Sequence, residues 1–112
     1  GGERRRLAIA GVLAMRPDCV LLDEPFANLD LPAIRSVLSV ITAAHASGRT
    51  IVVVTHELEK VLAHATRLAV MDSGKIVYDG SPEGLEAGRY EELGLRDPFR
   101  SGARLEELSW LR

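Results

Sequence analysis

The heptad Cys19-Val20-Leu21-Leu22-Asp23-Glu24-Pro25 constrains the fold more than any other stretch of this 112-residue chain. Its short apolar run is too brief for a helix and shows no period-2 alternation, which predicts a strand buried on both faces of a parallel sheet. Such strands deliver ligand-binding groups at their carboxyl ends. Asp23 and Glu24 follow there and project to opposite sides. One carboxylate could therefore hold a metal while the other faces a reacting water. Alternatively, the two acids only open a loop and cap a helix.

Composition fits a soluble globular domain, with 46% hydrophobic and 27% charged residues. The formal net charge of −2 argues against a protein whose main partner is nucleic acid. The single cysteine, Cys19, excludes an internal disulfide framework, and its apolar neighbours predict a buried thiol. The longest apolar stretch, Leu7–Met15, is too short to span a bilayer. The chain opens with Gly1-Gly2 rather than with Met, so we expect it to be part of a longer protein.

A helix is predicted from Arg4 to Met15, where most side chains are apolar, and Pro17 would stop it. The pattern indicates that this helix is well buried. Gly1 and Gly2 at its start could present backbone N–H groups to an anion, or they form an ordinary N-terminal turn. The run Arg4-Arg5-Arg6 is typical of a solvated helix face rather than of a nucleic-acid site.

A second helix is predicted after the opening strand. Asp30 is a natural N-cap, and Pro32 falls in the first turn, where its missing N–H costs nothing. The helix should run to about Ala46 and end at Ser47-Gly48. One apolar stripe, typical of a core-facing helix, contains Ile34, Val37, Leu38, Ile41 and Ala44.

Ile51–Val54 is β-branched and predicts a second buried parallel strand, which ends in Thr55 and His56. His56 is either a loop residue or a member of a site. Because the carboxyl ends of parallel strands meet at one edge of a sheet, the second interpretation gains support from the acids that end the first strand.

The remainder of the chain predicts smaller elements. We expect a short helix over Leu58–His64 and a β-hairpin from Arg67–Asp72 and Lys75–Asp79 with a turn between them. Ser81 and Pro82 should begin another short helix. From residue 88 the chain is charged and interrupted by glycine and proline, which predicts one or two small helices with disorder toward the end. We assign no functional role to His45 or His64.

Together these segments resemble the C-terminal half of an ATP-binding cassette (ABC) ATPase, over residues 1 to about 87, with 88–112 as a tail. The matching segments are Gly1-Gly2-Glu3 for the end of the signature motif, Val20–Pro25 for the Walker B strand, Asn28-Leu29-Asp30 for the D-loop, His56 for the switch histidine, and Met71–Ile76 with Asp79–Pro82 for the closing hairpin. Ala10–Met15 and Glu92–Pro98 are similar to segments in the ATPases of energy-coupling factor importers. These importers take up vitamins such as biotin, or metal ions such as cobalt and nickel.

The resemblance implies a P-loop NTPase-like α/β fold, a parallel sheet flanked by helices that ends in a β-hairpin and short helices. It also implies ATP hydrolysis coupled to transport, with ATP and Mg²⁺ bound. Asp23 would bind Mg²⁺ through a water, as this strongly hydrated ion prefers. Glu24 would polarise the water that attacks the γ-phosphate. His56 would contact the γ-phosphate and orient that water.

The same resemblance implies an assembly. Gly1, Gly2 and Glu3 would bind the nucleotide held by a second ABC ATPase subunit, identical or different, and Asn28 and Asp30 would bridge the two subunits. A transmembrane transporter subunit would hold the pair at the cytoplasmic face of the membrane, and no nucleic acid partner is expected.

The chain contains no G-x-x-x-x-G-K-[ST] phosphate-binding loop; Gly74-Lys75 is followed by Ile76 and does not qualify. We therefore expect the chain by itself to bind ATP poorly and to be inactive, with Ile51–Val54 as an open apolar edge that invites aggregation. Two other functions stay open. One is a soluble ABC ATPase of the DNA-repair or ribosome-associated type, and the other is a non-catalytic fragment that only binds a partner.

Overall fold

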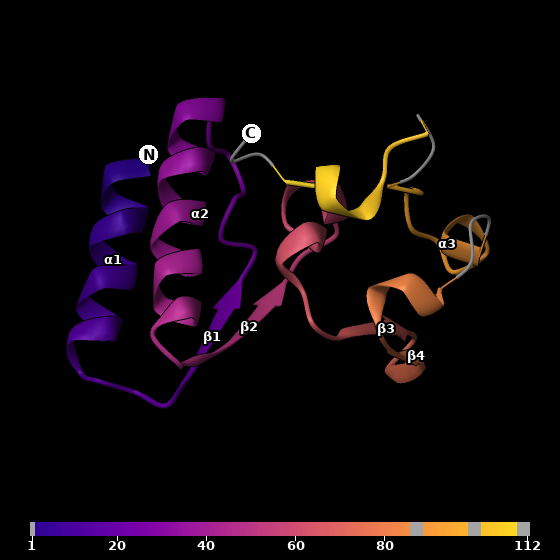
Figure 1. Cartoon of the computed structure of the whole chain (residues 1–112), viewed down its shortest axis with the longest axis horizontal. Helices are drawn as coiled ribbons and strands as arrows, with labels where there is room; N and C mark the ends of the chain where they lie inside the picture. The colour runs from indigo at the N-terminus through magenta and orange to yellow at the C-terminus, as the bar shows by residue number, and fades with distance from the viewer. Residues whose placement is uncertain (1, 86–88, 99–101, 110–112) are drawn as a thin grey trace. The chain divides into compact units, whose positions relative to one another are not determined.

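A computed structural model of the chain describes residues 2–85, 89–98 and 102–109. Its contacts divide the chain into two units, one ending at Thr55 and the other beginning at His56. The first unit alternates helix and strand, and Figure 1 shows its two helices side by side. Its elements are α1 (Gly2–Ala14), β1 (Cys19–Asp23), α2 (Leu31–Ala46) and β2 (Thr50–Val54).

β1 and β2 form a parallel pair, with Cys19 opposite Thr50 and Asp23 opposite Val54. The chain passes from one strand to the other through α2, the connection that parallel neighbours require. The predicted α/β class with a parallel sheet is therefore confirmed.

α2 forms as its sequence predicts. The side chain of Asp30 accepts a 3.0 Å hydrogen bond from the backbone N–H of Ala33, which satisfies one of the free donors of the first turn. Pro32 lies in that turn, and Ser47 is the C-cap. All five members of the predicted apolar stripe are buried, namely Ile34, Val37, Leu38, Ile41 and Ala44.

α1 is present, but the prediction that it is well buried is wrong. Ile9 is its only buried residue, while Leu7 and Met15 are each 74% exposed. The helix is apolar on several faces, and within the first unit it packs against α2 along one of them. No other described helix or strand of the first unit makes a comparable contact with α1.

The strands are also less buried than expected. In β1, Val20 is 2% exposed but Leu21 is 69% exposed, and Val52 and Val54 of β2 are exposed on the alternating positions. The prediction of a buried Cys19 thiol is wrong for the same reason, since this side chain is exposed. Within the first unit α2 packs against β2, and the sheet consists of these two strands alone among the described residues.

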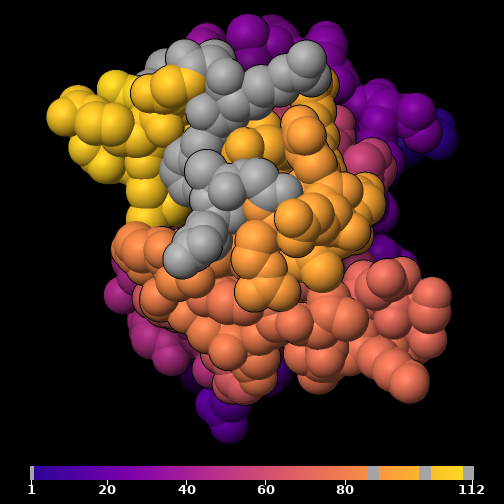
Figure 2. Space-filling view, turned by 90° about the vertical axis from the view of Figure 1, so that its right-hand side faces the viewer, coloured from indigo at the N-terminus to yellow at the C-terminus, as the bar shows by residue number. Residues whose placement is uncertain are grey.

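The second unit contains short elements. The predicted helix over Leu58–His64 is instead two single turns of 3₁₀ helix, Leu58–Lys60 and Leu62–His64. The predicted hairpin is confirmed as an antiparallel pair, β3 (Leu68–Asp72) and β4 (Lys75–Gly80). Ser73 and Gly74 between the strands both have positive φ, as a two-residue type I′ turn requires. Figure 2 shows the hairpin, in salmon, standing out at the lower right of the surface.

Residues after the hairpin pack into the core of the second unit. Pro82–Gly84 and Leu105–Glu107 are 3₁₀ turns, and α3 (Arg89–Glu92) is a single helical turn. The backbone N–H of Ala63 donates to the carbonyl of Leu108 at 3.0 Å. This core joins residues on both sides of residue 87, where the sequence predicted the tail to begin; its buried members are Leu58, Leu62, Leu68, Val70, Leu85, Tyr90 and Leu108.

Candidate functional site

The two adjacent carboxylates lie at the carboxyl edge of the parallel pair. β1 ends at Asp23, whose side chain is exposed, and Glu24 follows with a half-buried side chain. The backbone N–H of Glu24 donates to the carbonyl of Val54 at 2.7 Å, which extends the ladder by one residue. Both acids therefore stand where an open α/β sheet presents its binding groups.

The loop that begins at Glu24 consists of two consecutive turns. The N–H of Ala27 donates to the carbonyl of Glu24 at 3.2 Å, with Pro25 in the second turn position that suits it. The N–H of Leu29 then donates to the carbonyl of Phe26 at 3.4 Å. Phe26 is 1% exposed and anchors the loop in the core of the first unit.

Two candidate site residues adopt left-handed backbone conformations in this loop. Glu24 has φ of 46° and Asn28 has φ of 60°. Asn tolerates this region, but for Glu it is a strained conformation of the kind that costs about 1–3 kcal/mol and clusters at functional sites. Arg16 and Ser73 also have positive φ, but Glu24 combines this strained conformation with a place at the carboxyl edge of the sheet.

Arg5 of α1 contacts the same loop through its guanidinium. Nη1 donates to the carbonyl of Glu24 at 3.1 Å and to that of Pro25 at 2.8 Å, and Nη2 donates to the carbonyl of Ala27 at 3.4 Å. The prediction that all three arginines of the run are solvated is therefore wrong for Arg5. A signal was present, because Arg5 lies one helical turn before Ile9, the buried residue of α1.

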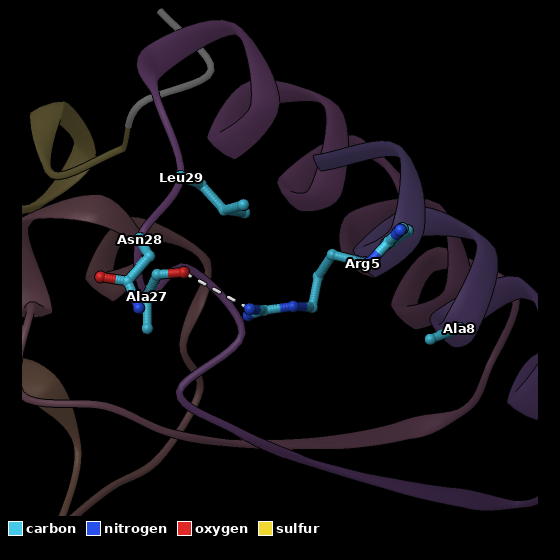
Figure 3. Close-up of a pocket in the computed structure, with 6 residues that line it drawn as sticks. Arg5, Ala8, Ala27, Asn28 and Leu29 are labelled. Carbon is cyan, nitrogen blue, oxygen red and sulfur yellow. Dashed lines mark hydrogen bonds between the residues drawn. The ribbon is translucent and has the colours of Figure 1, made fainter. Parts of the chain in front are cut away.

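A shallow pocket of ≈ 350 Å³ lies between α1 and this loop. Figure 3 shows the Arg5 side chain reaching from the helix toward the carbonyl of Ala27, while the Asn28 amide points away from the guanidinium. Three of its lining residues are polar and three are apolar: Arg4, Arg5 and Asn28, and Ala8, Ala27 and Leu29.

Two of the predicted nucleotide-binding residues, Gly2 and Glu3, lie in the first turn of α1. Gly1 falls outside the described residues, and Glu3 is exposed. Gly2 lies against the start of α2, so close that a Cβ on it would stand 2.4 Å from the Cβ of Ala33. Gly2 therefore has a packing role of its own, as Asp30 has in capping α2.

The structure brings together Asp23, Glu24, Asn28 and Asp30 along one loop of the first unit. His56, by contrast, is the first residue of the second unit and is exposed. It follows the end of β2 after Thr55, as the sequence predicted.

Asp23 offers a donor set that suits Mg²⁺. Mg²⁺ is commonly held by one or two carboxylates, with waters and substrate phosphates completing its shell. No group of three or more His, Cys, Asp or Glu side chains within residues 2–85, 89–98 and 102–109 could enclose a metal ion by itself. A single exposed carboxylate at the strand end therefore fits Mg²⁺ that is held mainly by a nucleotide.

Comparison with known proteins extends the resemblance seen in the sequence. No protein-family model matches the chain. It is 49% identical over 82 residues to the energy-coupling factor transporter ATP-binding protein EcfA2 of Mycoplasmopsis synoviae, covering 73% of this chain and 26% of that protein. It is 47% identical over 98 residues to an ABC transporter ATP-binding protein of Halobacterium salinarum (88% and 42%) and 43% identical over 101 residues to EcfA1 of Caldanaerobacter subterraneus (88% and 36%).

Solved structures share the fold. A nucleotide-free ATP-binding cassette from an ABC transporter matches with a TM-score of 0.74 at 22% identity, over 86% of this chain and 40% of that one. An SMC ATPase structure matches with a TM-score of 0.51 at 24% identity, over 83% and 58%.

The α/β fold of the chain thus matches that of an ABC ATPase cassette. More particularly, the chain is homologous to part of the ATP-binding proteins of ABC transporters, and energy-coupling factor proteins predominate among the relatives. The chain spans between about a quarter and two-fifths of the length of these relatives. No helix in the part of the chain that the structure describes is long and apolar enough to cross a membrane.

Proposed function

We propose that the chain is the hydrolytic part of an ATP-binding subunit of an ABC transporter, of the energy-coupling factor type that imports a vitamin or metal ion. The observation that carries the proposal is the strained, left-handed Glu24 directly after Asp23 at the carboxyl edge of a parallel sheet. The names of its relatives support the transporter class.

In this proposal Glu24 is the general base that polarises the attacking water, a task worth roughly 10²–10⁴-fold in rate. Asp23, the last residue of β1, would hold Mg²⁺ through a water. Mg²⁺, when bound, neutralises charge on the phosphates. His56 contacts the γ-phosphate and orients the water. The phosphate-binding loop comes from residues other than these 112, among which no G-x-x-x-x-G-K-[ST] sequence occurs.

The proposed assembly contains two such subunits. Gly1, Gly2 and Glu3 contact the nucleotide held by the second subunit, and Asn28 and Asp30 bridge the pair. A transmembrane subunit would bind both at the cytoplasmic face of the membrane, so the complex should co-purify with a membrane protein. A soluble ABC ATPase would not co-purify with a membrane protein.

The decisive experiment compares Glu24→Gln with Glu83→Gln, an exposed acid of the second unit, in the complete protein. Glu24→Gln should bind Mg·ATP with unchanged affinity while hydrolysis falls at least about a hundredfold. Glu83→Gln should match the wild type. Turnover of Glu24→Gln within a few-fold of wild type would remove Glu24 from the role of base.

The proposal also concerns the 112-residue chain by itself. Without a phosphate-binding loop it should bind Mg·ATP only weakly and should not hydrolyse it. Titration calorimetry is the direct measurement, and micromolar affinity of the chain alone would contradict the expectation.

A further inference from the structure

Arg5 is the one charged side chain of α1 that the structure ties to the loop after β1. Its three hydrogen bonds run to the carbonyls of Glu24, Pro25 and Ala27, all of them backbone acceptors. The Glu24 carbonyl also accepts the N–H of Ala27, so Arg5 closes over a turn that is already formed. The guanidinium thus ties together the segment in which the left-handed Glu24 lies.

We propose that Arg5 is a positioning residue for hydrolysis, because its guanidinium fixes the backbone that holds Glu24 in place. The inference rests on the proposed role of Glu24 as general base. Arg5 donates to main-chain oxygens at both ends of the turn, so its loss frees the backbone rather than removing a reacting group.

The shape of the guanidinium accounts for the choice of residue. Its planar fork presents several N–H donors in fixed directions, whereas a lysine ammonium is a single point on a flexible stem. Carbonyls spread over Glu24–Ala27 can be bound together by the fork, but an ammonium would reach only part of the set. A positioning role therefore predicts that Arg5→Lys behaves like Arg5→Gln, although it keeps the charge.

The strained conformation explains why such a contact is needed. A left-handed non-glycine residue persists only when its surroundings over-determine it. Phe26 fixes the loop from the core side, and the hydrogen bond from Glu24 N–H to Val54 fixes it from the strand side. Arg5 supplies the third attachment, from α1.

The first arm of the test measures backbone order without activity. Amide hydrogen exchange over residues 24–30 should be about tenfold faster in Arg5→Gln and Arg5→Lys than in the wild type. Arg6→Gln, which removes an exposed arginine from the same helix, should leave exchange unchanged. Unchanged exchange in both Arg5 variants would overturn the proposal.

The second arm measures catalysis in the complete protein. Both Arg5 variants should lower kcat by about tenfold or more while the Kd for Mg·ATP stays within about twofold, because misplacement of a reacting group acts on the chemical step. Full activity restored by lysine would show that charge matters rather than the fork, and would overturn the positioning role. If the wild type hydrolyses no ATP, the proposed function fails, while the exchange arm still decides whether Arg5 orders the loop. Arg5→Lys also covers the case in which Arg5→Gln does not fold.

Discussion

Gly2 and Ala33 bring the first turns of α1 and α2 into contact, because a Cβ on Gly2 would stand 2.4 Å from that of Ala33. Such a contact requires glycine, since real Cβ atoms do not approach so closely. Gly2→Ala should therefore destabilise the first unit by about 1–3 kcal/mol through overpacking.

Gly11 provides the matched control on the same helix. Nothing lies within 4 Å of a Cβ at this position. Gly11→Ala should stabilise the protein by about 0.5–1 kcal/mol because alanine is the better helix former. Urea unfolding followed by circular dichroism measures both changes, and equal effects would contradict the packing role of Gly2.

Because the backbone of Glu24 is left-handed, glycine should be more stable than alanine at this position, the reverse of their order in a helix. Glu24→Gly should be more stable than Glu24→Ala by about 1 kcal/mol, because glycine, unlike alanine, adopts positive φ without strain. At Glu3, within α1, the order should be the usual one, with alanine above glycine. Free energies of unfolding of the four variants provide the test; if alanine is also favoured at position 24, the backbone there is not strained.

Arg67 and Asp79 form a two-pronged pair across the hairpin, at 2.7 and 2.6 Å. Hydrogen bonding to Arg67 lowers the pKa of Asp79 below its ordinary value of 3.8. A carboxyl with a lowered pKa in the folded state contributes stability that is present above the ordinary pKa and is lost as pH falls through the folded one. Asp79→Asn should abolish this acid-side dependence below about pH 4.

The effect should be small and sensitive to salt, because the pair is exposed. NMR titration of the Asp79 carboxyl, in wild type and in Arg67→Gln, directly measures how far Arg67 lowers its pKa. A midpoint that stays the same after Arg67 is removed would contradict the pairing.

Leu108 should matter more to stability than its place near the end of the chain suggests. It is 4% exposed and packs in the core of the second unit. Leu108→Ala should cost about 2–5 kcal/mol, whereas Leu7→Ala, at a position 74% exposed, should change stability by about 0.5 kcal/mol or less. Urea denaturation separates the two, and a harmless Leu108→Ala would show that this segment is not part of the core.

Local signals predicted much of the fold. The stripe from Ile34 to Ala44 repeats with the helical period behind an Asp30 cap, so both its limits and its buried face could be read in advance. The hairpin was predicted equally well, from two short strand segments on either side of the turn Ser73-Gly74. In these cases a few neighbouring residues determine the structure.

Burial and site geometry depended on distant residues instead. Val20 and Leu21 are equally apolar, yet the first is buried and the second exposed, because successive side chains of a strand point to opposite faces of the sheet. Arg5 differs from Arg4 and Arg6 through its orientation against a loop about twenty residues away. The left-handed φ of Glu24 carries no residue-type signal at all, because glutamate has no preference for that region. The positions of Asp23, Glu24 and His56 at strand ends were predictable; the contacts that hold Glu24 were not.

The parallel register of β1 and β2 has a consequence for the order of folding. Each pair in this register joins residues roughly 30 positions apart, so strand pairing must close a long loop before it gains any contact. α2 lies within that loop and is stabilised by local contacts, so we expect it to form first and bring the strands together. Glu24, whose N–H joins the ladder only beyond the last pair, should reach its final backbone conformation late in folding.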